Sequence, residues 1–296
     1  MVFGLEPAPV NGDGPGRAGW AARLVTIHRK NSRKPLPTVR PSWYAYAMTN
    51  TLDLKRSKDR KTTPSATPNG KVANVSNAFG LLSGRAYSCP AQTSACEKVC
   101  YAGRLEKVFT GFRKVMEHNY NAVKNASYDD LVSSLDSIVK DFIVESDKRK
   151  SAKVFRIHHD GDFFSNTYAQ AWATVVRNNP AVTFWAYTRS FTPACNVVAD
   201  LAGIPNLTLY LSVDEDNETY AKDVLVTFPS VLVATLTETA TEGKTVMVSL
   251  GRKVGGACPE VLGRIPLITN EGGACFSCGL CITGKADIRF ASKGVV

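Results

Sequence analysis

The sequence predicts an α/β fold, a partial (open) parallel β/α barrel with a cysteine-rich segment at its C-terminal end and a disordered tail at its N-terminal end. Three observations lead to this expectation. From residue 74 onward, short apolar runs alternate with amphipathic helical patterns, and such alternation is typical of parallel β-α-β units. Seven of the eight cysteines fall into two clusters, and most of the excess positive charge lies in the first 72 residues.

The basic tail is defined by charge and composition. Residues 1–72 hold 13 Lys/Arg against 4 Asp/Glu, a net charge of +9, whereas residues 73–296 hold 23 against 22, a net charge of +1. The tail is rich in Pro, Gly, Ser and Thr and lacks an apolar period, which predicts disorder, with one folded domain over 73–296. Such a tail contacts nucleic acid weakly or is a solvated extension without a partner. Met48 offers an alternative start, which would leave residues 1–47 outside the native protein.

The helices and strands of the folded part are predicted from local sequence patterns. The apolar run 77–84 ends in glycine and suits a buried strand that leads into the first cysteine loop. Residues 104–124 and 128–148 have apolar side chains at helical spacing, and Ser127 suits the N-cap of the second helix. Six or so strands are too few for a complete eight-fold barrel, which favours an open or partial one. Further strands are expected at 152–159, 182–190, 206–214, 231–237 and 244–250, and further helices at 166–180, 193–203 and 217–229.

The C-terminal cysteines have the spacing of a metal site. Cys275, Cys278 and Cys281 are arranged C-x2-C-x2-C, and Cys258 stands directly before Pro259. Three close thiolates and a remote Cys-Pro form the ligand set that a bacterial-type ferredoxin gives to one four-iron four-sulfur (4Fe-4S) cluster. Zinc is the main alternative, because four cysteines can close a tetrahedral site. Disulfides are a weaker one, because nothing in the chain looks secretory.

Composition excludes a membrane protein. The chain has 296 residues, 44% of them hydrophobic, and no apolar run approaches the ~20 residues that cross a bilayer. No segment resembles a signal peptide, so we expect the cytoplasm, where thiolate ligands stay reduced.

A second candidate site lies at the carboxyl ends of the predicted strands, where parallel α/β folds collect functional residues. We expect Cys100, His159, Asp162 and Arg189 to surround one cavity, with the last three as candidate catalytic groups. Capping and loop solvation are the alternative roles for each of these polar residues. Those that end or follow successive strands are Cys89, Cys96 and Cys100; His158, His159, Asp160 and Asp162; Tyr187, Thr188 and Arg189; and Ser212, Asp214 and Glu215.

These motifs also carry a resemblance. C-x3-CYA, GDFF, YTRS and the terminal C-x2-C-x2-C occur in order, and together they resemble the phage-associated family called gene product eighty-eight over roughly residues 74–284. This resemblance implies a fold and a cluster rather than a reaction, and the host cytoplasm as location. The chain resembles radical S-adenosylmethionine enzymes more distantly, with C-x6-C-x3-C where C-x3-C-x2-C is usual. That likeness implies a second 4Fe-4S cluster on Cys89, Cys96 and Cys100, and S-adenosylmethionine near Gly161, Asp162, Tyr187 and Arg189.

Three functions therefore stay open. The first is a structural or electron-transfer protein with one or two 4Fe-4S clusters and a redox partner. The second is a radical S-adenosylmethionine enzyme with an auxiliary cluster. The third is a zinc-stabilised protein that contacts nucleic acid through its tail. The sequence favours an iron–sulfur protein and sets neither substrate nor oligomeric state.

Overall fold

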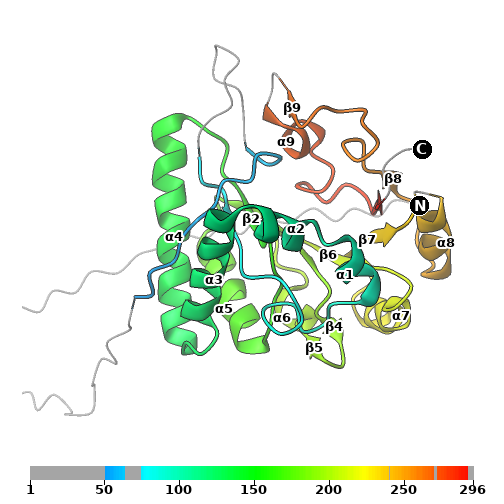
Figure 1. The fold of residues 1–296 in the computed structure, drawn as a ribbon, viewed down its shortest axis with the longest axis horizontal. Helices are drawn as coiled ribbons and strands as arrows, with labels where there is room; N and C mark the ends of the chain where they lie inside the picture. Colours follow the sequence, from blue (N-terminus) through cyan, green and yellow to red (C-terminus); the bar gives the residue numbers. More distant parts are fainter. Residues whose placement is uncertain (1–50, 64–74, 240, 270–271, 293–296) are drawn as a thin grey trace, which may run out of the picture. The chain divides into compact units, whose positions relative to one another are not determined.

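A parallel sheet of seven strands forms the centre of the protein, in the order β1-β2-β3-β6-β7-β11-β8 (Figure 1). Two small antiparallel pairs, β4 with β5 and β9 with β10, stand apart from it. The strands are β1 (Ala78–Phe79), β2 (Val154–Ile157), β3 (Thr183–Thr188), β4 (Phe191–Thr192), β5 (Cys195–Asn196), β6 (Leu207–Val213), β7 (Leu232–Thr237), β8 (Gly256–Ala257), β9 (Ile268–Thr269), β10 (Gly272–Gly273) and β11 (Ile288–Ala291).

This computed structural model describes residues 51–63, 75–239, 241–269 and 272–292. Most of the basic tail, and with it the disorder predicted there, lies outside these ranges. The α/β class and the parallel sheet are confirmed. Within the described ranges the sheet is not closed into a barrel, because it has two edges, β1 and β8. The last strand, β11, inserts between β7 and β8 and was not predicted.

Helices connect and cover the strands. Residues 104–124, expected as one helix, form two, which break at Phe109, where the backbone is extended. Ser127 caps α4 as predicted, because its hydroxyl accepts a hydrogen bond from the Asp130 amide. The helices are α1 (Ser94–Val99), α2 (Tyr101–Val108), α3 (Thr110–Val123), α4 (Tyr128–Arg149), α5 (Asn166–Asn178), α6 (Val198–Leu201), α7 (Glu218–Thr227), α8 (Glu242–Ser249) and α9 (Ala274–Cys278).

Two further segment predictions need correction. Residues 244–250 were predicted as a strand but form most of the helix α8 and its C-cap, Leu250. Val246, Met247 and Leu250 are buried there while Val248 is 64% exposed, which is the spacing of a helical face and not of alternation. Residues 193–203, predicted as a helix, hold β5 and only one short helical turn, α6.

The two faces of the sheet have different partners. Because side chains alternate along a strand, Phe155 and Phe184 point into the main core, which they share with residues of α4 and α5. Trp185, Tyr187 and Tyr210 belong to two smaller clusters, which include residues of the cysteine-rich segment 258–282. That segment therefore packs on the sheet face opposite to the main core.

Residues 51–63 are part of this fold, although they were assigned to the disordered tail. Ser57 pairs with Ala78 at the β1 edge, Arg56 forms an ion pair with Glu145, and Leu52 and Leu54 pack against the main core. The folded unit therefore begins before residue 73, because the charges of this segment are used in internal pairs rather than left in solvent. Within the described ranges, no helix has the length and apolar content that a membrane span requires.

Candidate functional site

The four C-terminal cysteines lie together beneath one face of the sheet. Cys258 follows β8, Cys275 and Cys278 are three residues apart on α9, and Cys281 follows in the next turn. The Cys281 thiol interacts electrostatically with those of Cys258 and Cys278, and the Cys275 thiol with that of Cys281. All eight cysteines of the chain are free thiols. The remote Cys-Pro and the C-x2-C-x2-C run thus meet in space.

Aromatic side chains of the sheet cover these thiols. The Tyr187 hydroxyl forms a hydrogen bond with the Cys281 sulfur, and the ring of Tyr187 packs against Cys275 and Cys281. The Tyr210 hydroxyl donates to the carbonyl of Ala286 at 2.9 Å. Burial raises the pKa of Cys275 to about 12 and that of Cys281 to about 11, and neighbouring thiols add to both increases. These thiols are therefore protonated at neutral pH unless a cation displaces their protons.

A buried arginine, Arg156 of β2, lies beside this thiol group. Its guanidinium bonds to Asp59 at 2.6 Å and to the Tyr101 hydroxyl at 3.2 Å. It also stands over the rings of Trp185 and Tyr187, at 4.9 and 5.8 Å from their centroids. The sequence analysis missed Arg156, although a charged residue inside the apolar run VFRI signals a buried ionic contact.

The segment 57–63 holds the cysteine helix in place. The Lys61 carbonyl accepts hydrogen bonds from the amides of Cys275 (2.8 Å) and Phe276 (3.3 Å), and the Lys61 ammonium pairs with Glu260 at 2.9 Å. Farther along, the Gly273 amide donates to the Thr63 carbonyl at 3.1 Å. These groups orient α9 from outside the sheet. Nothing in the composition of this segment indicated that role.

The first cysteine group lies at the carboxyl ends of β1 and β2. Cys100 caps α2, and its sulfur accepts a hydrogen bond from the Gly103 amide at 3.3 Å. The thiols of Cys96 and Cys100 interact with each other, whereas that of Cys89 interacts with Asp162 and Asp160. The three sulfurs therefore share an edge of the sheet, and Asp162 interacts with the thiols of both Cys89 and Cys96.

Asp162 and Arg189, both predicted site residues, form a buried network at this edge. The Asp162 carboxylate accepts hydrogen bonds from the Thr188 hydroxyl and from the Arg189 amide, each at 2.7 Å. Burial raises the pKa of Asp162 to about 6, although these bonds oppose the increase. The guanidinium of Arg189 contacts Asp214 at 2.5 Å and Thr93 at 3.3 Å. Its Nη2 is buried without a hydrogen-bond partner among the described residues, so this nitrogen remains able to donate to a ligand.

The two histidines have different surroundings. His158 bonds to the Tyr168 hydroxyl at 2.9 Å, and burial with the charge of neighbouring His159 lowers its pKa to about 3, so it is neutral and structural. His159 Nδ1 lies 3.0 Å from the Phe79 carbonyl and must donate its proton there. That leaves His159 Nε2 as a buried acceptor without a partner among the described residues. His158 Nδ1 is likewise buried without a partner there, so each histidine has one unpaired ring nitrogen.

Asp160 adds a second buried carboxyl to this edge. No hydrogen bond of normal geometry reaches its carboxylate oxygens within the described residues. Burial and the adjacent Glu106 raise the pKa of Asp160 well above its usual value. Glu106 accepts from the amide and hydroxyl of Ser83 at 2.7 and 3.0 Å. The Asp160 carboxyl therefore holds its proton more tightly than an exposed aspartic acid does.

Gly161, predicted to bind a cofactor, is required by close packing. Its φ is +79°, and a Cβ there would lie 2.4 Å from the Ser88 hydroxyl and 2.9 Å from the Leu81 carbonyl oxygen. The glycine lets the first cysteine loop approach the end of β2. This contact accounts for Gly161 without a ligand.

The predicted meeting of Cys100, His159, Asp162 and Arg189 stays a prediction. Asp162 and Arg189 are directly bonded, and both interact with the thiol of Cys96. His159 is connected to the cysteine loop because the Tyr101 hydroxyl donates to its carbonyl. Tyr187 points instead to the C-terminal thiols. In the ranges that the structure describes, no three His, Cys, Asp or Glu side chains are placed to hold a single metal ion.

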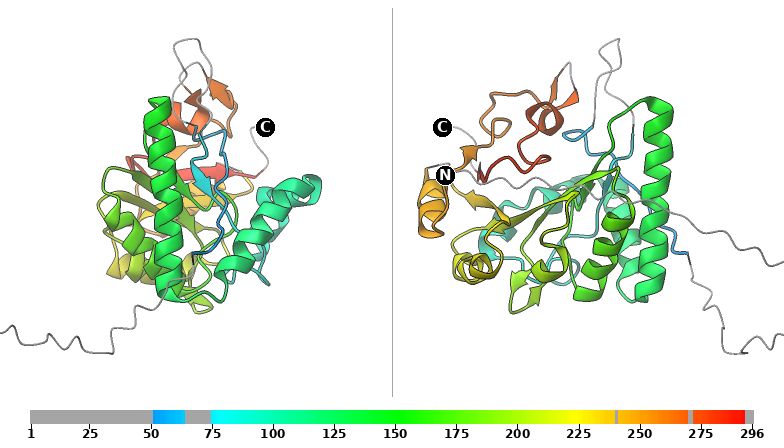
Figure 2. Two further views of the ribbon diagram at one scale, coloured as in Figure 1. Left: turned by 90° about the vertical axis from the view of Figure 1, so that its left-hand side faces the viewer. Right: turned by 180° about the vertical axis from the view of Figure 1, so that it is seen from behind.

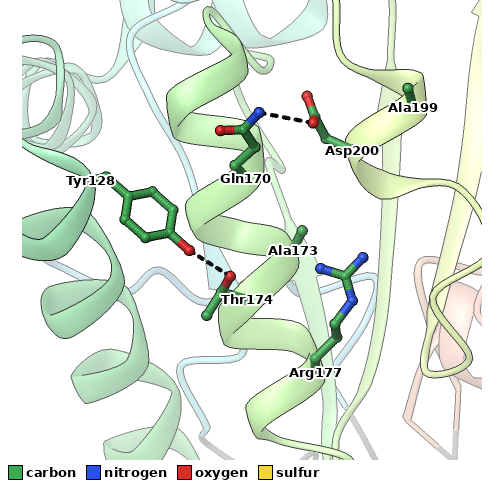
Figure 3. Close-up of a pocket in the computed structure, with 7 residues that line it drawn as sticks. All are labelled: Tyr128, Gln170, Ala173, Thr174, Arg177, Ala199 and Asp200. Atoms are coloured by element: carbon green, nitrogen blue, oxygen red, sulfur yellow. Dashed lines mark hydrogen bonds between the residues drawn. The ribbon is translucent and has the colours of Figure 1, made fainter.

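Two surface clefts lie outside the thiol groups. One, of about 470 Å³, borders the first cysteine loop and includes Arg85, Thr93 and Tyr220. The other, of about 360 Å³, is formed by α4, α5 and α6, and none of the predicted site residues lines it (Figure 3). Its polar groups bond to each other, Tyr128 to Thr174 at 2.8 Å and Gln170 to Asp200 at 3.1 Å.

The fold and these sites define a class, an α/β protein with an open parallel sheet and two groups of free cysteines. Comparison with known proteins places the chain more closely. It belongs to the Gene product 88 family, whose profile matches residues 52–284. It is 41% identical over 242 residues to the Gene 88 protein of Mycobacterium phage L5, and 42% identical over 243 residues to that of Mycobacterium phage D29. Each alignment covers 81% of this chain and 98% of the relative. No solved structure matches the chain significantly.

Proposed function

We propose that this protein binds a 4Fe-4S cluster through Cys258, Cys275, Cys278 and Cys281, in a structural or electron-transfer role. The observation that carries the proposal is the meeting of a remote Cys-Pro with the C-x2-C-x2-C run, since the thiol of Cys258 is far from the other three in sequence and interacts with that of Cys281 in space. Four soft thiolate donors are the ligands that such a cluster takes.

The surroundings suit a group with negative charge. Four thiolates and a cluster carry net negative charge, and two cations, Arg156 and Lys61, interact electrostatically with Cys275. Tyr187 offers a hydroxyl to the Cys281 sulfur. Hydrogen bonds to the ligating sulfurs and limited solvent access are the features by which a protein sets the potential of a bound cluster. When bound, the cluster would exchange single electrons; these residues would hold it and tune it.

Zinc is less well supported by the arrangement of these thiols. A tetrahedral zinc site has Zn–S distances of about 2.3 Å and so brings its sulfurs to within roughly 4 Å of each other. Within the described residues no three ligand side chains have such an arrangement. A four-iron cluster is larger and takes its thiolates from a C-x2-C-x2-C run with a remote Cys-Pro, which is the pattern of this chain, whereas a zinc ribbon usually pairs two C-x2-C knuckles.

The test is metal content after anaerobic preparation. The full chain should be brown, with about four iron and four sulfide per chain and broad absorbance near ~400 nm from thiolate-to-iron charge transfer. Cys278→Ser should remove most of that absorbance. Cys195→Ser is the matched control, because Cys195 is buried elsewhere and donates to the Phe163 carbonyl. A colourless protein with stoichiometric zinc, or equal iron loss in both variants, would contradict the proposal.

A radical S-adenosylmethionine enzyme is the second candidate, with the first cysteine group as the site of its cluster. The observation in its favour is the unpartnered Nη2 of Arg189 beside Cys96, because a guanidinium of this kind binds a carboxylate such as that of a methionyl group. S-adenosylmethionine should be titrated into the reduced protein while the electron paramagnetic resonance spectrum is recorded. An unchanged signal without 5′-deoxyadenosine would remove this candidate and leave the first.

A further inference from the structure

The bend between α2 and α3 has an unusual surface. Over residues 98–114, the side chains Lys98, Arg104, Lys107, Arg113 and Lys114 are exposed, and the nearest exposed acidic side chains, Glu97 and Glu117, lie just beyond the two ends of this stretch. Its one carboxylate, that of Glu106, is buried and bonded to Ser83. None of the five cations forms an ion pair with another residue that the structure describes. We call this surface, residues 98–114, the α2–α3 patch.

Apolar side chains are interleaved with these cations. Val108 is 69% exposed and Phe109 is 56% exposed, and Tyr101 and Leu105 are exposed beside them. The helical period explains the mixture, because Ala102 and Glu106 occupy the inward face of α2 and leave its other positions to solvent. The Tyr101 ring stays accessible even though its hydroxyl bonds inward to the His159 carbonyl. Figure 2 shows the teal region that contains α2 and α3 projecting from the side opposite to α4.

We propose that the α2–α3 patch binds single-stranded nucleic acid. Unpaired cations on a projecting surface attract a polyanion. Exposed rings between cations add the stacking platform that single strands use, because unpaired bases present their faces. A nucleic-acid duplex would contact only the cations, because its paired bases do not present their faces to the exposed rings. Four apolar side chains form a small face compared with the broad apolar side of a membrane-surface helix.

The patch is distinct from the basic tail and adjoins the first cysteine group. Tyr101 directly follows Cys100, so a strand bound across Tyr101 and Phe109 would pass the edge of the sheet that carries Asp162 and Arg189. The binding itself depends on exposed charge and rings, and it does not require the cluster proposed for the C-terminal thiols.

The test compares two charge reversals of equal size in the full chain, which retains its tail. Lys107→Glu with Arg113→Glu alters the patch. Lys244→Glu with Lys253→Glu changes the net charge equally at exposed sites in and after α8, which packs against β7 and β11. The probe is a short fluorescein-labelled oligothymidylate, followed by anisotropy over a range of salt concentrations.

We expect the patch reversal to weaken binding about tenfold or more and to reduce the slope of log K against log salt by about 1.4, at about 0.7 per lost phosphate contact. The control pair should weaken binding less than about twofold. Phe109→Ala leaves the charge unchanged and should still weaken binding about fivefold, from the lost stacking of one base. Circular dichroism of all variants should match that of the parent, because these side chains are exposed.

Three results would overturn the proposal. Equal weakening by both charge reversals would assign binding to the tail or to net charge. Competition by poly-glutamate as effective as that by unlabelled oligonucleotide of equal charge would show general polyanion attraction. Patch-dependent binding to anionic lipid vesicles without binding to the oligonucleotide would assign the surface to a membrane.

Discussion

Replacing Asp59 by Asn should strongly destabilise the fold, because Asp59 neutralises the buried Arg156. The two side chains are only 10% and 12% exposed, and their nearest atoms are 2.6 Å apart. Asn keeps the shape and can still accept from the Lys61 amide, which donates to Asp59 at 3.0 Å. The substitution therefore removes mainly the charge, from a residue that composition alone assigned to a disordered tail.

The expected loss follows from the partners that remain. Removing one member of a buried ion pair costs roughly 3–5 kcal/mol, since the other charge is left uncompensated. Arg156 would retain the Tyr101 hydroxyl and the faces of Trp185 and Tyr187, and such ring contacts contribute up to about 2 kcal/mol when desolvated. We therefore expect a loss of stability at the lower end of this range, about 3 kcal/mol. Such a loss raises the unfolded fraction by about two orders of magnitude.

Urea denaturation of the anaerobically prepared full chain measures this loss. Asp53→Asn is the matched control in the same segment; its side chain is 77% exposed and contacts His118 at 3.3 Å, and such a surface change lies within about 0.5 kcal/mol. Adding Arg156→Met to Asp59→Asn should recover at least about 1 kcal/mol, because it removes the uncompensated charge.

The effect should also depend on pH. Burial alone would raise the pKa of Asp59, but the charge of Arg156 and its hydrogen bond outweigh this and lower the pKa below 3.8. Because the pKa of Asp59 is lower in the folded state, its carboxylate stabilises the protein at pH values above its pKa in the unfolded chain. That stabilisation is lost as the pH falls through its pKa in the folded state. The difference between parent and Asp59→Asn should be constant from about pH 5 to 8 and shrink below about pH 4. A loss below about 1 kcal/mol at pH 7, or one equal to that of Asp53→Asn, would refute the reasoning.

Two further substitutions test the site. Gly161→Ala should lower the free energy of unfolding by about 2–3 kcal/mol from backbone strain and overlap with the cysteine loop. Gly111→Ala, with no atom within 4 Å of its Cβ, should be neutral or stabilising in the same urea titration; equal effects would show that the loop does not pack as described. Tyr187→Phe should lower the potential of a bound cluster, by roughly 40 mV for each ~1 kcal/mol of hydrogen bond lost to the Cys281 sulfur. Tyr210→Phe is the control, because that hydroxyl donates to a carbonyl; a dithionite titration followed by electron paramagnetic resonance compares them, and an unshifted Tyr187→Phe would rule out tuning.

The pattern of apolar residues predicted the sheet better than its edges. Runs such as VTFWAYT and NLTLYLSV are buried on both faces, so local sequence suffices to indicate parallel strands. β11 and residues 51–63 were missed because their place depends on partners far along the chain: β11 is held between β7 and β8, and Ser57 against Ala78. Long-range pairing of this kind leaves little local signal.

The cysteine motifs predicted which residues form the candidate sites, but not their surroundings. Spacing alone indicated that Cys258 joins Cys275, Cys278 and Cys281. It gave no reason to place Tyr187 with them, because the side on which a strand residue points depends on register. Tyr187 was expected with Arg189, two residues later, whose guanidinium instead contacts Thr93 and Asp214 near the first cysteine group.

Arg156 lies between the two cysteine groups. On one side it bonds to the hydroxyl of Tyr101, the residue after Cys100; on the other it stands over Tyr187, which bonds to Cys281. Its charge opposes the increase in the pKa of Cys275 and of Cys281, whereas the cation that acts on the Cys96 thiol is Arg189. Each cysteine group therefore has its own neighbouring cation, and negative charge on its thiols is stabilised mainly by that cation. A variant of Arg156 would change the C-terminal thiols directly, so the role of each group must be tested by substituting its own cysteines.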